Sequence, residues 1–154
     1  MKWRMVDRVL AFQPWQSLTA VKAVSFEELT LLERWGCPAG LPPSLCLEVG
    51  VEAARWLVAA SSGFELATML SEAADFQFAQ PLDGETLRAA VSVRQRDAAS
   101  LRAAVSISAA GARGVLAHGL LDFGLVRLDE GFDAEWLRGI WQDLNRDVGQ
   151  AYSS

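Results

Sequence analysis

The fold of this chain is decided by residues 41–60, which read LPPSLCLEVGVEAARWLVAA. Pro43 suits the first helical position, where its missing N–H costs nothing, and residues 61–63 (SSG) supply a stop. The stretch therefore predicts one helix of about five turns. Because this helix is apolar almost all the way round and its flanks are strand-like, we expect other elements to wrap it, as in a sheet curled around a helix.

Three charged residues interrupt the apolar surface of this helix, namely Glu48, Glu52 and Arg55. Their spacing of i, i+4 and i+7 places them on one stripe, and their charges argue against a membrane span. Two carboxylates one turn apart in a partly dry site repel each other, so we expect one of the two pKa values to be raised. Alternatively, the stripe is simply the least buried side of the helix, with Arg55 as the partner of Glu52.

Length and composition fit a single domain. The chain has 154 residues, of which 51% are hydrophobic and 21% charged, and a domain of this size buries roughly 70% of its unfolded surface. The net charge is −5 and the arginines are scattered, which excludes a nucleic-acid footprint. Residues 1–8 carry charges where a signal peptide needs its apolar core, so we expect a cytoplasmic protein. Cys37 and Cys46 lack a Cys-x-x-Cys spacing and are expected to be reduced structural thiols.

Strand patterns flank the helix on both sides. We expect strands at residues 5–13, 17–24, 64–78 (one strand with an interruption), 86–94, 101–109 and 115–128. Ser25 and Glu28 form a capping-box pattern that predicts a short helix ending near Trp35. The elements together predict an α+β domain over residues 1–154, in which residues 129–154 are a C-terminal helical extension.

The last segment of the chain has helical periodicity. Asp133 suits the cap of a helix in which Trp136, Ile140, Trp141 and Leu144 recur at helical spacing. We expect these four side chains to be buried against the sheet. A surface that binds a partner protein would explain the same apolar stripe.

A family resemblance is carried by the order and spacing of the strands after residue 87 and by three sequence blocks: residues 6–10 (VDRVL), 42–48 (PPSLCLE) and 78–87 (FAQPLDGETL). In that order the three resemble the V-D-R-V, P-G-V-L-x-x-E and F-x-x-P-x-x-P-G-D-x-L blocks of β-hydroxyacyl-acyl-carrier-protein dehydratases of the FabA/FabZ type. Asp83 replaces the second proline of the last block, and Glu85 replaces its aspartate. The resemblance extends over about residues 5–128 and implies the hotdog fold, a curved antiparallel sheet wrapped around one long central helix.

The resemblance implies a role in fatty-acid or polyketide-type metabolism. In the family, a histidine of an H-F-P-G loop and a glutamate of the helix come from opposite subunits of a dimer and dehydrate a 3-hydroxyacyl thioester. Glu48 matches the glutamate, whereas Arg34 replaces the histidine and Pro43 replaces the glycine whose N–H serves the oxyanion. Because arginine stays protonated, we expect the dehydratase activity of this lyase family to be lost or altered. The resemblance places Arg34, Pro43, Ser44 and Glu52 at the substrate.

Three functions stay open on these grounds. The first is an acyl-thioester dehydratase that uses Glu48 with a substitute for the histidine. The second is a non-catalytic member that pairs with an active dehydratase-like subunit or holds acyl chains. The third is a hotdog thioesterase in which the helix carboxylate of Glu48 activates water. The implied partners are an acyl carrier protein or another acyl thioester, in a homodimer or heterodimer, with no cofactor, metal, nucleic acid or membrane.

The single histidine of the chain, His118, lies four residues before Asp122 in the expected strand 115–128. The spacing places both side chains on the same strand face, which is compatible with a catalytic pair. A histidine in a strand is more often a structural residue that forms hydrogen bonds with its neighbours than a catalytic one. The dehydratase family has no active-site residue at this position.

Overall fold

A computed structural model of the chain describes residues 5–24, 42–79, 86–109, 114–128, 134–146 and 148. Its elements, in chain order, are β1 (Arg8–Gln13), β2 (Ser17–Ala23), α2 (Pro43–Ser61), β3 (Leu66–Phe78), β4 (Thr86–Arg96), β5 (Ser100–Ala109), β6 (Val115–Arg127) and α3 (Ala134–Leu144). The expected short helix before Trp35 lies outside the described residues, as do Arg34, Cys37 and the expected cap Asp133.

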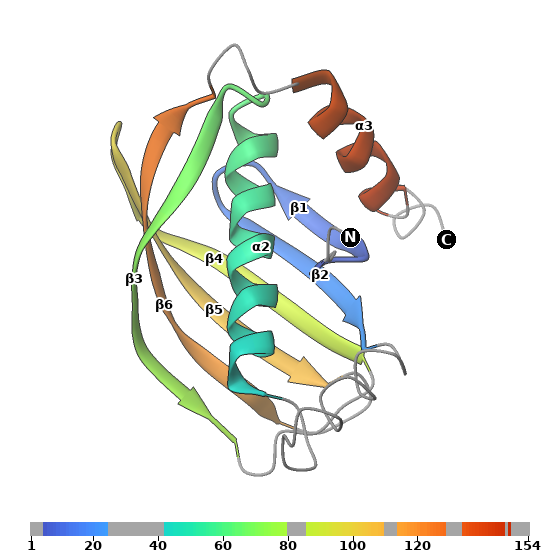
Figure 1. The fold of residues 1–154 in the computed structure, drawn as a ribbon, viewed down its shortest axis with the longest axis vertical. Coiled ribbons are helices and arrows are strands. Elements are labelled where there is room, and N and C mark those ends of the chain that lie inside the picture. Colours follow the sequence, from blue (N-terminus) through green and yellow to red (C-terminus); the bar gives the residue numbers. More distant parts are fainter. Residues whose placement is uncertain are drawn as a thin grey trace.

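The described strands form one antiparallel sheet in the order β1-β2-β4-β5-β6-β3. β1 and β2 are the expected hairpin, with Gln13 opposite Ser17. β3 follows α2 in the chain but lies at the far edge of the sheet, beside β6. Figure 1 shows the sheet curving around α2, with α3 on the side of α2 that faces β1. The expected curved sheet around one central helix is confirmed.

The central helix α2 begins and ends where the sequence predicts. Pro43 occupies its first turn, and Gly63 follows its end with a φ of +64°, a backbone conformation that glycine adopts without strain. Gly50 lies where the helix approaches β5, since a Cβ there would be 2.7 Å from Cγ1 of Val105. Among the described residues, neither helix is long and apolar enough to cross a membrane.

The inner and edge strands differ in how their side chains are buried. Along β5, every second side chain points into the core: Leu101, Ala103, Val105, Ile107 and Ala109. β3 is mostly exposed and its pairing with β6 shifts between Leu70 and Glu72 and between Ala74 and Gln77. These irregularities are β-bulges. The first of them lies at the interruption that the sequence predicts between residues 69 and 73, and the second lies outside it.

The C-terminal helix α3 packs on β1 and α2. The ring of Trp141 lies edge-on to Phe12 at 5.0 Å and stacks on Trp56 at 6.1 Å, and Leu144 is also fully buried. The expectation of burial is wrong for Trp136, which is 47% exposed. Since Trp136 lies about 140° around the helix from Trp141, a rotation that buries Trp141 leaves Trp136 at the surface.

Candidate functional site

A cavity of about 540 Å³ lies beside the second half of α2. It is lined by Glu52, Arg55 and Trp56 of α2, Leu66, Ala67 and Thr68 of β3, Leu128 after β6, and Leu137 of α3. Most of this lining is apolar, and the polar groups are few. Such a combination of an apolar hollow with a small number of polar groups is typical of a ligand site.

Glu52 is the acidic group of this cavity, and both of its carboxylate oxygens are held in place. The backbone N–H of Met5 donates a hydrogen bond to Oε2 at 2.9 Å, and the indole Nε1 of Trp56 donates one to Oε1 at 3.3 Å. Burial raises the pKa of Glu52 above its ordinary value. The two hydrogen bonds and the nearby charges of Arg55 and Lys22 act in the opposite direction but do not cancel the effect of burial. A carboxylate with these properties is suited to proton transfer.

The raised pKa that the sequence predicts for one carboxylate of the stripe is confirmed, with a different cause. Glu48 makes no contribution to it, because the effect comes from the removal of Glu52 from water. Glu48 lies one turn earlier on the same stripe and is exposed. The chain around Met5 and the packing of α3 therefore distinguish two residues that look equivalent in the sequence.

Of the other residues that the resemblance places at the substrate, Pro43 and Ser44 do not line this cavity. Pro43 and Ser44 form the exposed first turn of α2, where the carbonyl of Pro42 accepts a hydrogen bond from the N–H of Leu45 at 3.0 Å. Arg34 is outside the described residues. Of the expected substrate-binding set, the structure brings only Glu52 into the cavity.

The cavity includes residues that the sequence reasoning missed. Oγ1 of Thr68 is buried without a hydrogen-bond partner among the described residues, and such a group calls for an explanation. Trp56 could have been found, because it lies one helical turn after Glu52. Leu137 and Thr68 had no such signal, since only the docking of α3 and the placement of β3 bring them to the helix.

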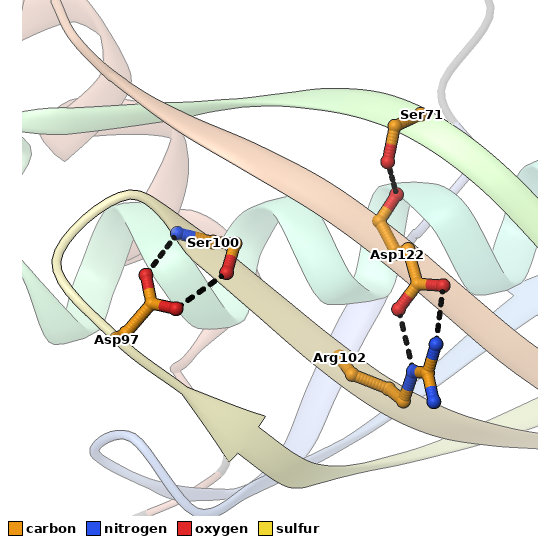
Figure 2. Close-up of polar contacts among 5 residues, drawn as sticks. All are labelled: Ser71, Asp97, Ser100, Arg102 and Asp122. Atoms are coloured by element: carbon orange, nitrogen blue, oxygen red, sulfur yellow. Dashed lines mark hydrogen bonds and ion pairs between the residues drawn. The ribbon is translucent and has the colours of Figure 1, made fainter.

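The structure pairs Asp122 with Arg102. Figure 2 shows that the carboxylate of Asp122 accepts hydrogen bonds from Nε and Nη2 of Arg102, at 2.7 and 3.0 Å, while Ser71 Oγ donates to its backbone carbonyl. The hydrogen bond and charge of Arg102 hold the pKa of Asp122 below its ordinary range. His118 is exposed and lines a separate open hollow of about 570 Å³ away from Glu52. Arg102, rather than His118, is the partner of Asp122.

No family model and no curated protein matches the sequence. Solved structures do match. A thioesterase family protein from Silicibacter pomeroyi is 16% identical with a TM-score of 0.61, covering 79% of this chain and 85% of its own. The smu.793 protein from Streptococcus mutans, bound to acetyl CoA, is 9% identical with a TM-score of 0.62, covering 80% and 90%. A hot-dog-like protein from Thermanaerovibrio acidaminovorans is 14% identical with a TM-score of 0.60, covering 85% and 92%.

At these identities the likeness is one of fold. The comparisons do not show membership of the dehydratase family. Three of the similar structures carry the name thioesterase. The curved antiparallel sheet and the helix that it wraps superpose on two of the similar structures over 80% and 85% of this chain. The chain has the hotdog fold.

Proposed function

We propose that this protein binds acyl thioesters and hydrolyses them, with Glu52 as the general base. The observation that carries the proposal is a half-buried carboxylate of raised pKa in a mostly apolar cavity of about 540 Å³. Glu52 takes a proton from water, the water oxygen bonds to the thioester carbonyl carbon, and the C–S bond breaks. The products are a carboxylic acid and a thiol, which receives the proton from Glu52.

The environment of Glu52 supports this role. Each carboxylate oxygen accepts one N–H hydrogen bond, which leaves further lone pairs free to accept a proton from water. The donors Met5 and Trp56 fix the orientation of the carboxylate, as a general base requires. Burial meanwhile makes the ionised carboxylate more basic than a glutamate in water.

Coenzyme A and acyl carrier proteins both present the acyl group on a phosphopantetheine arm, and we propose this shared chemistry for the substrate. Arg55 lies three residues after Glu52, lines the cavity and is exposed, so its guanidinium is available to the phosphate of such an arm. One of the similar structures is described as bound to acetyl CoA. The proposed substrate is therefore an acyl group on a phosphopantetheine arm, whether coenzyme A or an acyl carrier protein carries that arm.

A test compares Glu52→Gln with Glu48→Gln on a panel of acyl-coenzyme A substrates. We expect Glu52→Gln to lower kcat/KM by about 10²–10⁴-fold, the usual contribution of a positioned base. Glu48→Gln is the matched control, and because Glu48 is exposed we expect an effect within about twofold. Equal rates for wild type and Glu52→Gln would refute the role of Glu52.

Dehydratase activity is the second candidate, and the block from Pro42 to Glu48 favours it. In that reaction Glu48 would be the catalytic carboxylate, and the missing N–H of Pro43 would weaken stabilisation of the enolate. Hydration of enoyl thioesters that is abolished by Glu48→Gln and kept by Glu52→Gln would support the dehydratase over the thioesterase.

We also propose that β3 pairs with another subunit, either a second copy or a dehydratase-like partner. β3 is 13 residues long, contains neither lysine nor proline, and has only β6 beside it among the described strands. Met69 and Leu70 on this edge are 63% and 38% exposed. Although the two bulges and the charged Glu72 and Asp75 protect part of this edge, the exposed apolar stretch at Met69 and Leu70 leaves the rest open, and open strand edges tend to pair. A stable monomer at micromolar concentration in sedimentation, alone and with a dehydratase-like partner, would contradict pairing, and Met69→Lys should weaken it.

A further inference from the structure

The C-terminal helix supplies one wall of the cavity beside Glu52. Leu137 of α3 lines it together with apolar side chains from three other parts of the chain: Trp56, Leu66, Ala67 and Leu128. Glu52, Arg55 and Thr68 are the polar members of the same lining. The cavity thus has an apolar portion next to the carboxylate, and α3 contributes to that portion through a single side chain.

The position of Leu137 is fixed by contacts of two residues that follow it along α3, Arg138 and Trp141. One turn later, Trp141 is buried against Phe12 and Trp56. The neighbouring Arg138 donates a hydrogen bond from Nη2 to the carbonyl of Gly63 at 3.1 Å, and its guanidinium lies 5.6 Å from the centre of the Phe64 ring. Leu137 is itself partly buried against the core. The wall is therefore preformed, as ligand sites usually are.

We propose that this cavity holds the acyl group of the thioester, and that Leu137 limits the length of the acyl chain. The inference rests on the proposed function for the class of ligand. At about 30 Å³ for each water-sized group, a cavity of about 540 Å³ has room for roughly 18 such groups, so a medium-length acyl chain fits within it and leaves room for a water at Glu52. An acetyl group would leave most of the apolar lining in contact with water. Each methylene that a longer acyl chain buries in the cavity raises its affinity roughly fourfold.

The test uses S-alkyl-coenzyme A thioethers of 2 to about 12 carbons, which bind like thioesters but have no carbonyl to hydrolyse. Dissociation constants are measured by calorimetry for the wild type, Leu137→Trp and Leu137→Ala. Leu116→Trp and Leu116→Ala are the matched controls, because Leu116 is also a partly buried leucine on the core but does not line the cavity. Thermal melting of each variant establishes that it is folded.

We expect wild-type affinity to rise roughly fourfold per methylene until the cavity is full. Leu137→Trp should weaken binding of the eight-carbon probe by roughly tenfold or more while leaving the two-carbon probe unchanged, and Leu137→Ala should move the best length to longer chains. The Leu116 variants should keep the wild-type profile. An unchanged profile in both Leu137 variants, or the same change in the Leu116 variants, overturns the inference.

Because the thioethers are not turned over, this outcome is independent of catalysis. Hydrolysis that needs Glu52, combined with a chain-length profile that ignores Leu137, would refute the acyl wall alone. A profile that follows Leu137 in a protein that hydrolyses no thioester would refute the proposed hydrolysis and keep the acyl site.

Discussion

Two successive turns of α2 carry a glutamate on the same stripe, and they differ in almost everything else. Glu48 is exposed near the start of the helix, beside Pro43 and Ser44. Glu52 is half-buried, receives hydrogen bonds from Met5 and Trp56, and has a raised pKa. Both glutamates lie on α2, and the difference comes from what surrounds each of them. Met5 and Trp56 bind the carboxylate of Glu52, and Trp141 of α3 stacks on Trp56, whereas Glu48 lies in water.

The largest expected effect is on the packing that covers Glu52. Trp141→Ala should lower the free energy of unfolding by about 3–5 kcal/mol, because it removes a buried ring from contact with Phe12 and Trp56. It should also expose Glu52 and make it resemble Glu48. Chemical denaturation measures the stability. Trp136→Ala is the matched control and, being half exposed, should cost much less; equal losses would contradict the observed docking of α3.

The hydrogen bond from Met5 can be removed without changing Glu52. Met5→Pro eliminates the backbone N–H that Oε2 accepts, and a hydrogen bond to a charged group contributes about 1.5–3 kcal/mol. Met5→Ala keeps the N–H and serves as the control. The loss of stability should be seen where Glu52 is ionised and should shrink when acid protonates it. A loss of equal size at every pH would mean that the proline acts through the backbone alone.

The buried hydroxyl of Thr68 predicts an effect of about 1 kcal/mol in the opposite direction. Thr68→Val replaces a hydroxyl that has no partner within the described part of the chain by a methyl group of similar size, so it should leave stability unchanged or increase it by about that amount. If Thr68 donates to the thioester carbonyl, the same variant should lower kcat without destabilising the fold. Thr68→Ser, which keeps the hydroxyl, should retain kcat. A clear loss of stability in Thr68→Val would show that the hydroxyl has a partner.

The raised pKa of Glu52 predicts a dependence of stability on pH. Between the ordinary glutamate value of 4.5 and the raised value, the folded state binds more protons than the unfolded state. The contribution of Glu52 to stability is therefore largest below pH 4.5 and is lost as the pH rises through the folded-state pKa. Denaturation across pH gives the free energy of unfolding of the wild type and of Glu52→Gln, and the wild-type value minus the variant value is the contribution of Glu52. This contribution should fall as the pH rises, and an increase with pH in this range would contradict the raised pKa.

The smallest expected effect concerns His118, which lies four residues before Asp122 on the same strand. His118→Ala should leave thioester hydrolysis within about twofold of the wild type, since His118 is exposed and Asp122 is bound to Arg102. Steady-state rates on one acyl-coenzyme A substrate are sufficient. A loss comparable to that of Glu52→Gln would place the chemistry on the outer face of the sheet.

Much of the fold could be predicted from the sequence because the local signals agree with one another. Pro42 and Pro43 mark the start of α2, and residues 61–63 (SSG) mark its end. In β5 and β6, the alternation of apolar and other residues indicates which side chains point into the core. The burial of Cys46, which raises the pKa of its thiol, fits the expected structural role of that residue. The candidate site was harder to predict, since Thr68 and Leu137 reach Glu52 from elements distant in the sequence.

By itself, the sequence determined that one apolar helix must be wrapped by a sheet, and that its charges lie on a single stripe. Both properties follow from periodicity, which depends only on neighbours along the chain. Only the tertiary structure decided which glutamate leaves the water, which tryptophan of α3 is buried, and which residue pairs with Asp122. These outcomes depend on how separate elements dock, because the desolvation of a side chain is set by the groups that cover it.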